Sequence, residues 1–373
     1  MSPTVREVRY ADRYAVDALK RRNQLVTKSS SDQWNRLWQE NPTKQKDQSL
    51  PMGWVLEHCG NVVGYLGNVQ IYYYYGGKRF LAAAARGFAV DSLFRSHTLR
   101  LTAAFFSQKN VDLLLNTSAN ESAAAVFQLC KAEKVPCPDY DKAMYWIIRS
   151  RQVVSSALRK KSGCNIALAA IGGILFGWVI YVERLLRRRG PFGNGVGWDI
   201  RIIEASSVGT EFDELWQRTL QERPQCILAE RSAESLRWHF GHCVDSDRQE
   251  KFICAWTADK LVGYVVLTRE NSEEIGLMRS RIVDLIAENN APELIDFLLY
   301  AAYQQARIDG SHLLELIGFP LQIRERLLAG RAYTRQLPSW PFWYKVVAPV
   351  LCDSALRQED AWYASMYDGD ASL

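Results

Sequence analysis

The stretch DQWNRLW (residues 32–38), followed by GWVLEHCGNVVGY (residues 53–65), decides the fold of this chain, because the same order of features returns later. About two hundred residues further on, SLRWHF (residues 235–240) precedes KFICAWTADKLVGY (residues 251–264). Each copy has an aromatic-rich amphipathic segment, a strand, a polar turn and a second strand that ends in Val-Gly-Tyr. Gly60-Asn61 and Asp259-Lys260 supply turn residues of a short β-hairpin. A repeat of this length predicts two copies of one domain rather than a solenoid.

The segments that follow each hairpin indicate the fold class. In the first half, the pattern predicts strands at 54–59, 62–75, 79–91, 111–116 and 145–149, and helices at 14–27, 98–109 and 121–133. In the second half, it predicts strands at 201–205, 281–285 and 313–317, and helices at 211–220 and 293–309. A strand meander followed by strand, helix, strand and helix predicts an α/β fold with a mixed sheet in each half.

Composition excludes several classes of protein. The chain has 373 residues, of which 48% are hydrophobic and 23% charged, which is ordinary for a globular protein with two cores. The net charge of +5 is too small to indicate nucleic-acid binding, and no basic run is combined with stacking aromatics. Eight cysteines without a CxxC pair favour a reducing compartment, and we expect neither a disulfide nor a metal site. The N-terminus lacks the apolar segment of a secretory signal.

One segment breaks the globular pattern. Residues 162–182 contain no charged side chain and are long enough to reach across a bilayer. Cations lie on both sides, so their distribution gives no orientation. A crossing would also separate the two repeats, so we favour a helix or helical hairpin in the cytoplasmic leaflet of the membrane. The alternative is a buried helix between the domains. The flanking cations are Arg159, Lys160, Lys161, Arg184, Arg187, Arg188 and Arg189.

These features predict three parts of the chain. Residues 1–150 form an N-terminal domain and residues 198–373 a C-terminal domain. Residues 151–197 form a connector that associates with the membrane, and its glycine-rich end at 190–197 is interpreted as a linker. We expect a cytoplasmic protein peripherally associated with the inner face of the membrane.

The order of elements resembles the Gcn5-related N-acetyltransferase (GNAT) superfamily over nearly the whole chain. The strand at 87–91, the loop at 92–97 and the helix at 98–109 lie where that family binds acyl-CoA. The stretches around Trp38 and Trp238 and the tail at 362–370 are similar to a branch found with bacterial exopolysaccharide genes. The two-copy layout also resembles the Fem-type aminoacyltransferases. The resemblance rests on order and spacing rather than on one motif.

The loop that would bind the pyrophosphate of acyl-CoA departs from the family pattern. Active members carry glycines there, whereas this chain has Arg95-Ser96-His97-Thr98-Leu99-Arg100. The side-chain charges of Arg95, His97 and Arg100 are interpreted as a replacement for the free backbone, with Ser96 and Thr98 as donors or caps. The alternative is a solvated basic loop. The resemblance adds Ala89, Val90, Asn116 and Asn120 as acyl-CoA contacts.

The second copy has Ala287-Glu288-Asn289-Asn290-Ala291-Pro292 at the equivalent place. Because this loop holds an acid and no cation, we expect acyl-CoA only in the first copy. Acyl transfer from a thioester to an amine also needs a base, an oxyanion site and an acid for the thiolate. The resemblance implies an oxyanion site at a backbone amide near 89–92. Candidates for the base are Asp91 and Glu121, with His97 as a further titrating group; candidates for the acid are Tyr140 and Tyr145.

Together these expectations give a function. The chain is interpreted as an acyl-CoA-dependent N-acyltransferase, with acetyl-CoA as donor and an amino sugar or lipid-linked polysaccharide precursor as acceptor. The substrate class comes from the family resemblance. Two alternatives stay open: a catalytically inactive tandem module that binds a glycan or a protein at the membrane, and a Fem-like aminoacyltransferase.

Overall fold

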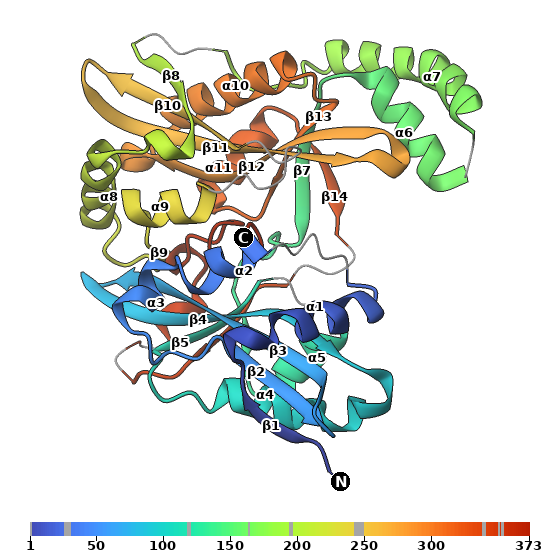
Figure 1. The fold of residues 1–373 in the computed structure, drawn as a ribbon. Coiled ribbons are helices and arrows are strands. Elements are labelled where there is room, and N and C mark those ends of the chain that lie inside the picture. The colour runs from blue at the N-terminus through green and yellow to red at the C-terminus, as the bar shows by residue number, and fades with distance from the viewer. Residues whose placement is uncertain are drawn as a thin grey trace. The chain divides into compact units, whose positions relative to one another are not determined.

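The computed structural model describes residues 2–25, 31–117, 121–162, 165–193, 197–241, 250–337, 341–349, 351 and 354–373. The chain forms two compact units, and each is built from separate stretches of sequence. The first unit comprises residues 1–138, 223–244 and 338–373, and the second unit comprises residues 139–222 and 245–337. Figure 1 shows the elements of both units.

The first unit contains an eight-stranded sheet in the order β1-β2-β3-β4-β5-β15-β6, with β9 paired to β3 off this path. Its strands are β1 (Thr4–Glu7), β2 (Gly53–His58), β3 (Asn61–Tyr75), β4 (Lys78–Val90), β5 (Leu113–Asn116), β6 (Glu133–Lys134), β9 (Leu228–Ala229) and β15 (Trp343–Val346). Its helices are α1 (Arg13–Arg22), α2 (Ser31–Trp38), α3 (Pro42–Lys46), α4 (Thr98–Phe106), α5 (Glu121–Leu129) and α9 (Ala233–Phe240). Short 3₁₀ turns are η1 (Tyr10–Asp12), η2 (Ser92–His97), η6 (Ala355–Arg357) and η7 (Glu359–Ala361).

The second unit contains a seven-stranded sheet in the order β14-β7-β13-β12-β11-β10-β8. Its strands are β7 (Lys142–Ile147), β8 (Asp199–Ile203), β10 (Glu250–Thr257), β11 (Lys260–Ser272), β12 (Leu277–Ala287), β13 (Leu313–Ile317) and β14 (Tyr333–Gln336). Its helices are α6 (Ser150–Ser162), α7 (Ile166–Leu186), α8 (Thr210–Glu222), α10 (Pro292–Ile308) and α11 (Leu321–Ala329). Its 3₁₀ turns are η3 (Ala205–Ser207), η4 (Glu273–Ile275) and η5 (Glu288–Asn290).

The mixed α/β class predicted from the sequence is confirmed. In each sheet one pair, β4–β5 or β12–β13, is parallel, and the other pairs are antiparallel. Both hairpins of the repeat form, but their turns lie one residue earlier than expected. His58 pairs with Asn61 and Thr257 with Lys260, so the turn residues are Cys59-Gly60 and Ala258-Asp259. Cys59 and Ala258 adopt positive φ angles there, because a tight turn between twisted strands requires this conformation.

The two units exchange segments, so their boundaries differ from the expected 150 and 198. The strand expected to close the first half is β7, and it pairs with β13 and β14 in the second unit's sheet. In Figure 1 this green strand lies beside the orange and red strands of that sheet. In return β15, from the end of the chain, pairs with β5 and β6. Periodicity identifies a strand but does not identify its partner, which depends on contacts distant in sequence.

The aromatic segment of the second repeat also joins the first unit. Trp238 on α9 donates through Nε1 to the carbonyl oxygen of Arg36 on α2, at 2.7 Å. The Arg36 guanidinium donates to the carbonyl oxygen of His239, at 3.3 Å. The two aromatic helices therefore pack against each other within one unit.

The core of the first unit lies between one face of its sheet and the helices α4 and α5. Ala83 and Ala85 of β4 belong to this core, together with Phe105 and Phe127. Because side chains alternate along a strand, Arg86 lies on the opposite face of the sheet from Ala85. That opposite face carries the polar groups described next.

Candidate functional site

The parallel strands β4 and β5 separate within the first unit's sheet. Residues 82–84 of β4 pair with residues 113–115 of β5. Beyond this point β4 continues to Val90, whereas β5 ends at Asn116. We call the place where β4 continues past the end of β5 the β4–β5 fork. Among the described residues, β5 provides no ladder partner for β4 after Ala84.

A backbone amide of β4 faces this fork. The Asp91 amide donates to the carbonyl oxygen of Val63 on β3, at 2.9 Å. N–H groups alternate along a strand, so that of Val90 points away from β3 and toward the fork. Ala89, also expected to contact acyl-CoA, instead turns its amide to β3. A β-bulge at Gly87 and Phe88 precedes these two residues, since Arg86 pairs with Gly67 and Ala89 with Tyr65.

The loop after β4 brings only part of the expected cationic cluster to the N-terminus of α4. Arg95 and Ser96 are exposed and His97 half-buried, and Arg95 and His97 have no hydrogen-bond or ion-pair partner among the described residues. Arg100 points elsewhere, because its guanidinium donates to the carbonyl oxygen of Pro3 at 2.8 Å. Thr98 opens the helix, and no side chain caps the helix at His97. The Thr98 amide already donates to the carbonyl oxygen of Arg95, because η2 runs directly into α4. An anion at this helix end would therefore be attracted by the helix dipole and by Arg95.

Asp91 is held in an ion pair rather than poised as a base. Its carboxylate accepts from Arg22 Nε at 2.8 Å and Nη2 at 2.7 Å, and from Asn23 Nδ2 at 2.9 Å. The hydrogen bond from Arg22 is the largest cause that lowers the pKa of Asp91. This arrangement ties the end of β4 to α1.

The remaining predicted residues are scattered. Asn116 is buried at the end of β5, but Asn120 and the side chain of Glu121 fall outside the described residues. Tyr140 and Tyr145 belong to the second unit, whereas Asp91 belongs to the first. Tyr145 stacks on Tyr333 with ring centroids 5.6 Å apart, and burial raises its pKa.

A cluster that the sequence interpretation missed lies beside the β-bulge. Lys20 of α1 is half-buried, and its Nζ lies 5.0 Å from the centroid of the Tyr65 ring. Gly87, with φ of 66°, lets it approach, because a Cβ there would be 3.1 Å from Lys20 Cε and 3.4 Å from its Nζ. Burial, and then the charge of Arg86, lowers the pKa of Lys20 to about 8. The sequence offered Lys20 only as part of a basic helix.

Three buried polar atoms around this cluster lack a hydrogen bond. They are the Tyr65 hydroxyl, Asp17 Oδ1 and Trp34 Nε1, which have no partner among the described residues. The Trp34 ring lies 6.4 Å from that of Tyr65, and Asp17 precedes Lys20 by one helical turn. Buried polar atoms are normally paired, so this face has unused hydrogen-bonding capacity.

The C-terminal tail bonds to both branches of the fork. Arg86 of β4 donates to the carbonyl oxygens of Asp370 and Leu373, both at 2.6 Å. Thr117, just after β5, donates to the Asp370 carboxylate at 2.7 Å. Gly369 is needed at this contact, because a Cβ would lie 2.4 Å from the Thr117 side chain.

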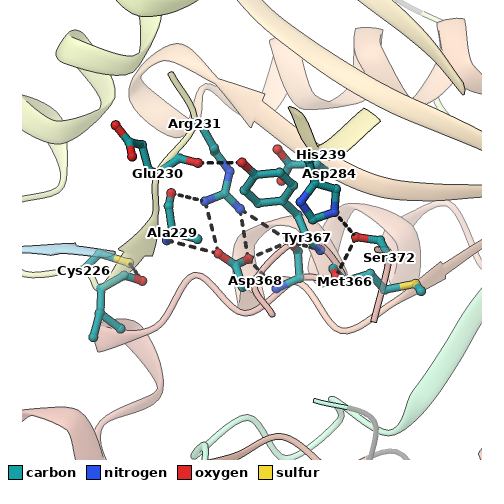
Figure 2. A network of polar contacts seen from close by, with 12 residues as sticks. Cys226, Ala229, Glu230, Arg231, His239, Asp284, Met366, Tyr367, Asp368 and Ser372 are labelled. Carbon is teal, nitrogen blue, oxygen red and sulfur yellow. Dashed lines mark hydrogen bonds and ion pairs between the residues drawn. The ribbon is translucent and has the colours of Figure 1, made fainter. Parts of the chain in front are cut away.

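A buried network fixes the tail, as Figure 2 shows. Arg231 pairs with Asp368 at 2.9 Å, and each side chain is only 1% exposed. His239 Nε2 lies 2.7 Å from the Ser372 hydroxyl, which itself donates to the carbonyl oxygen of Met366. His239 is therefore the donor to Ser372, which assigns its proton to Nε2. Because breaking a buried ion pair costs free energy, the tail is held firmly in the first unit.

The second unit has a similar fork without a cationic loop. β12 pairs with β13 through residues 279–282 and then continues to Ala287. The following turn presents Glu288, whose carboxylate pairs with Arg218 at 2.6 Å and Lys260 at 2.7 Å. An acid that is already paired does not attract a phosphate.

The second unit also carries an apolar surface on α7. This 21-residue helix is long and apolar enough to cross a membrane, yet only 17% of its most apolar window is buried. It is therefore not the buried helix considered from the sequence. Large apolar side chains that are at least half exposed are Ile166, Leu168, Ile171, Ile174, Leu175, Phe176, Trp178, Val179, Leu185 and Leu186.

Solved structures with a similar fold include GCN5-related N-acetyltransferases. A GCN5-related N-acetyltransferase from Anabaena variabilis matches with a TM-score of 0.58 at 11% identity, over 92% of this chain and 72% of that one. One from Kribbella flavida gives 0.54 at 11% identity, over 93% and 72%. Eis1 from Mycobacterium abscessus gives 0.52 at 12% identity, over 92% and 73%. The fold is thus that of the GCN5-related N-acetyltransferases. No family model and no curated protein matches the sequence.

No metal-binding cluster is found in the described part of the chain, where no three His, Cys, Asp or Glu side chains are grouped to hold an ion.

Proposed function

We propose that the chain is an acyl-CoA-dependent N-acyltransferase whose donor site is the β4–β5 fork of the first unit. The observation that carries this proposal is the Val90 amide, which faces the fork and has no ladder partner on β5 among the described residues. Such an amide suits a thioester carbonyl or an amide group of a pantetheine chain, which are hydrogen-bonding partners in an extended geometry. The fold shared with acetyltransferases supports the same assignment.

The pyrophosphate of the donor would lie at the N-terminus of α4. The positive end of the dipole of this helix and the exposed Arg95 favour an anion there, with His97 beside them. Acetyl-CoA is the proposed donor. The proposed acceptor is an amino sugar or a lipid-linked polysaccharide precursor. This substrate class rests on the family resemblance, and a lipid-linked acceptor agrees with attachment of the protein to a membrane.

Isothermal titration with acetyl-CoA tests the donor site. Wild-type protein is expected to bind, and Arg95→Ala is expected to weaken binding by about tenfold, as removal of one charge-assisted contact does. Arg100→Ala is a matched control from the same segment, since Arg100 is engaged with Pro3, and it should bind like wild type. Absence of binding by the wild type would refute the proposal.

We also propose that α6 and α7 attach the protein peripherally to the inner face of an anionic membrane. The exposed apolar side chains of α7 supply the inserting surface. Lys160, Lys161 and Arg188 are exposed cations near the two ends of this helix, where they suit anionic headgroups.

Helices α6 and α7 form a helical hairpin, and both of its ends are bonded to the rest of the second unit. Arg159 of α6 donates to the carbonyl oxygen of Glu274 at 2.6 Å. Arg184 of α7 donates to the Tyr303 hydroxyl at 3.0 Å and to the carbonyl oxygen of Ile148 at 3.3 Å. A helix held along one folded unit lies in a single leaflet, and a crossing would also carry Arg151, packed on Gly177, into the bilayer.

Flotation with vesicles of phosphatidylglycerol and phosphatidylethanolamine tests the attachment. The double variant Leu175→Ser with Trp178→Ser should stay with the soluble fraction, and Ile308→Ser, which removes another exposed apolar side chain of the second unit, should float like wild type. Salt at 0.5 M should reduce the wild-type signal, because it screens headgroup charge. Equal flotation of the double variant and wild type would contradict the assignment.

The tail favours a second candidate, a catalytically inactive binding module. Its bonds to Arg86 and Thr117 occupy part of the fork on one face of the sheet. This candidate predicts no acetyl-CoA binding, so the same titration separates the two functions.

A further inference from the structure

The cluster around Lys20 lies where the proposed reaction would take place. Gly87, which Lys20 contacts, lies in the β-bulge of β4, three residues before Val90, whose amide faces the fork. An acyl carbonyl held by that amide would lie a few residues along the same strand from the Lys20 side chain. Two acids of this unit are engaged elsewhere, because Asp91 is held by Arg22 and the Asp370 carboxylate accepts from Thr117.

The surroundings of Lys20 keep its amine able to change charge. Tyr65 presents its ring, Arg86 brings a like charge on β4, and Asp17 brings an opposite charge on α1. Burial and Arg86 disfavour the ammonium, and Asp17 favours it. Within the described part of the chain, Lys20 has no ion pair that would hold its proton, in contrast to Arg22 in the same helix.

We propose that Lys20 is the proton carrier of the acyl transfer. This inference rests on the proposed function and names a catalytic residue for it. As the acceptor nitrogen forms its bond to the acyl carbon, the free amine of Lys20 takes the proton that this nitrogen loses. As the carbon–sulfur bond breaks, the resulting ammonium returns that proton to the departing CoA thiolate. One group thus serves both steps, and no further reactant is needed.

Kinetics with acetyl-CoA and D-glucosamine, followed by thiol release between pH 6 and 10, test the proton carrier. Wild-type kcat/KM should rise with pH to a plateau above about pH 8. Lys20→Met should lose at least 100-fold, in line with the usual contribution of acid–base catalysis. Lys20→Arg should lose as much, because a guanidinium keeps its charge and does not accept the proton. Both variants should bind acetyl-CoA within threefold of wild type.

An NMR titration of the lysine ¹³Cε signal, assigned with Lys20→Arg, gives a readout independent of turnover. Titration of Lys20 near pH 8 supports the proposal, and titration near the ordinary value of about 10.4 overturns it. A Lys20→Met enzyme with the wild-type rate and pH profile would also overturn it. Failure of the proposed function itself is separate, since it shows as a wild type that binds no acetyl-CoA.

Discussion

At the scale of single residues, the ion pair between Asp91 and Arg22 has a structural effect that can be measured. Asp91→Asn should lower the free energy of unfolding by about 1 kcal/mol, because the pair is partly exposed. The folded-state pKa of Asp91 is lowered, so this stabilisation is present above the unfolded pKa of about 3.9 and is lost as pH falls below it. Urea denaturation at pH 7 and pH 3 checks the difference, which should shrink at pH 3. An equal difference at both values would contradict this account.

Lys20 should destabilise the folded protein at neutral pH, whereas Asp91 stabilises it. Its folded-state pKa is depressed, so the unfolded chain binds more protons between about pH 8 and 10.4, and stability rises with pH across that window. Lys20→Met removes the buried ammonium and keeps an apolar side chain of similar length. We expect the variant to unfold at pH 7 with about 2 kcal/mol more free energy than wild type, and with little difference at pH 11.

Denaturation of the two proteins at these pH values measures that effect. A stabilised but inactive variant is typical of a residue kept for function. A destabilised Lys20→Met at pH 7 would instead indicate that Lys20 serves packing.

At the scale of elements, glycine determines how α6 and α7 pack. A Cβ on Gly173 would lie 2.7 Å from the carbonyl oxygen of Arg151, and one on Gly177 would lie 2.7 Å from its Cα. Both contacts involve backbone, which gives way only if the helices separate. Gly173→Leu and Gly177→Leu should therefore destabilise the second unit by about 1–3 kcal/mol, measured by thermal unfolding. Gly190→Ala is the control, because nothing lies within 4 Å of its added carbon.

Some helices and strands could be located from the sequence, whereas their pairing could not. Strong alternation and helical periodicity located β13 at its observed bounds, and placed β3, β4 and α10 within one residue of them. The same patterns did not assign β7 to its sheet, because the apolar residues of a strand fit more than one neighbour. Arg95 and Arg100 look equivalent in the loop sequence, yet a hydrogen bond to Pro3 turns Arg100 away. Lys20 gave no signal beyond charge, since its burial depends on Gly87 and Tyr65 in distant strands.

At the scale of the whole molecule, the exchange of segments makes the two repeats depend on each other for folding. Residues 1–150 hold most of the first unit but lack β15, α9 and the tail. Without them, β5 loses the ladder partner of residues 113–116, and Arg86 and Thr117 lose their bonds to Asp370. Residues 198–373 in turn lack β7, which stands between β13 and β14.

A split chain tests this dependence. Expressed alone, residues 1–150 and 198–373 should each give circular dichroism without a cooperative thermal transition, because each sheet is missing an interior strand. Expressed together, the two fragments should copurify and unfold cooperatively, since each supplies the strand that the other lacks. A fragment 1–150 that folds cooperatively by itself would show that the domain ends where the sequence repeat suggested. In that case the exchange of β7 and β15 would not be required for folding.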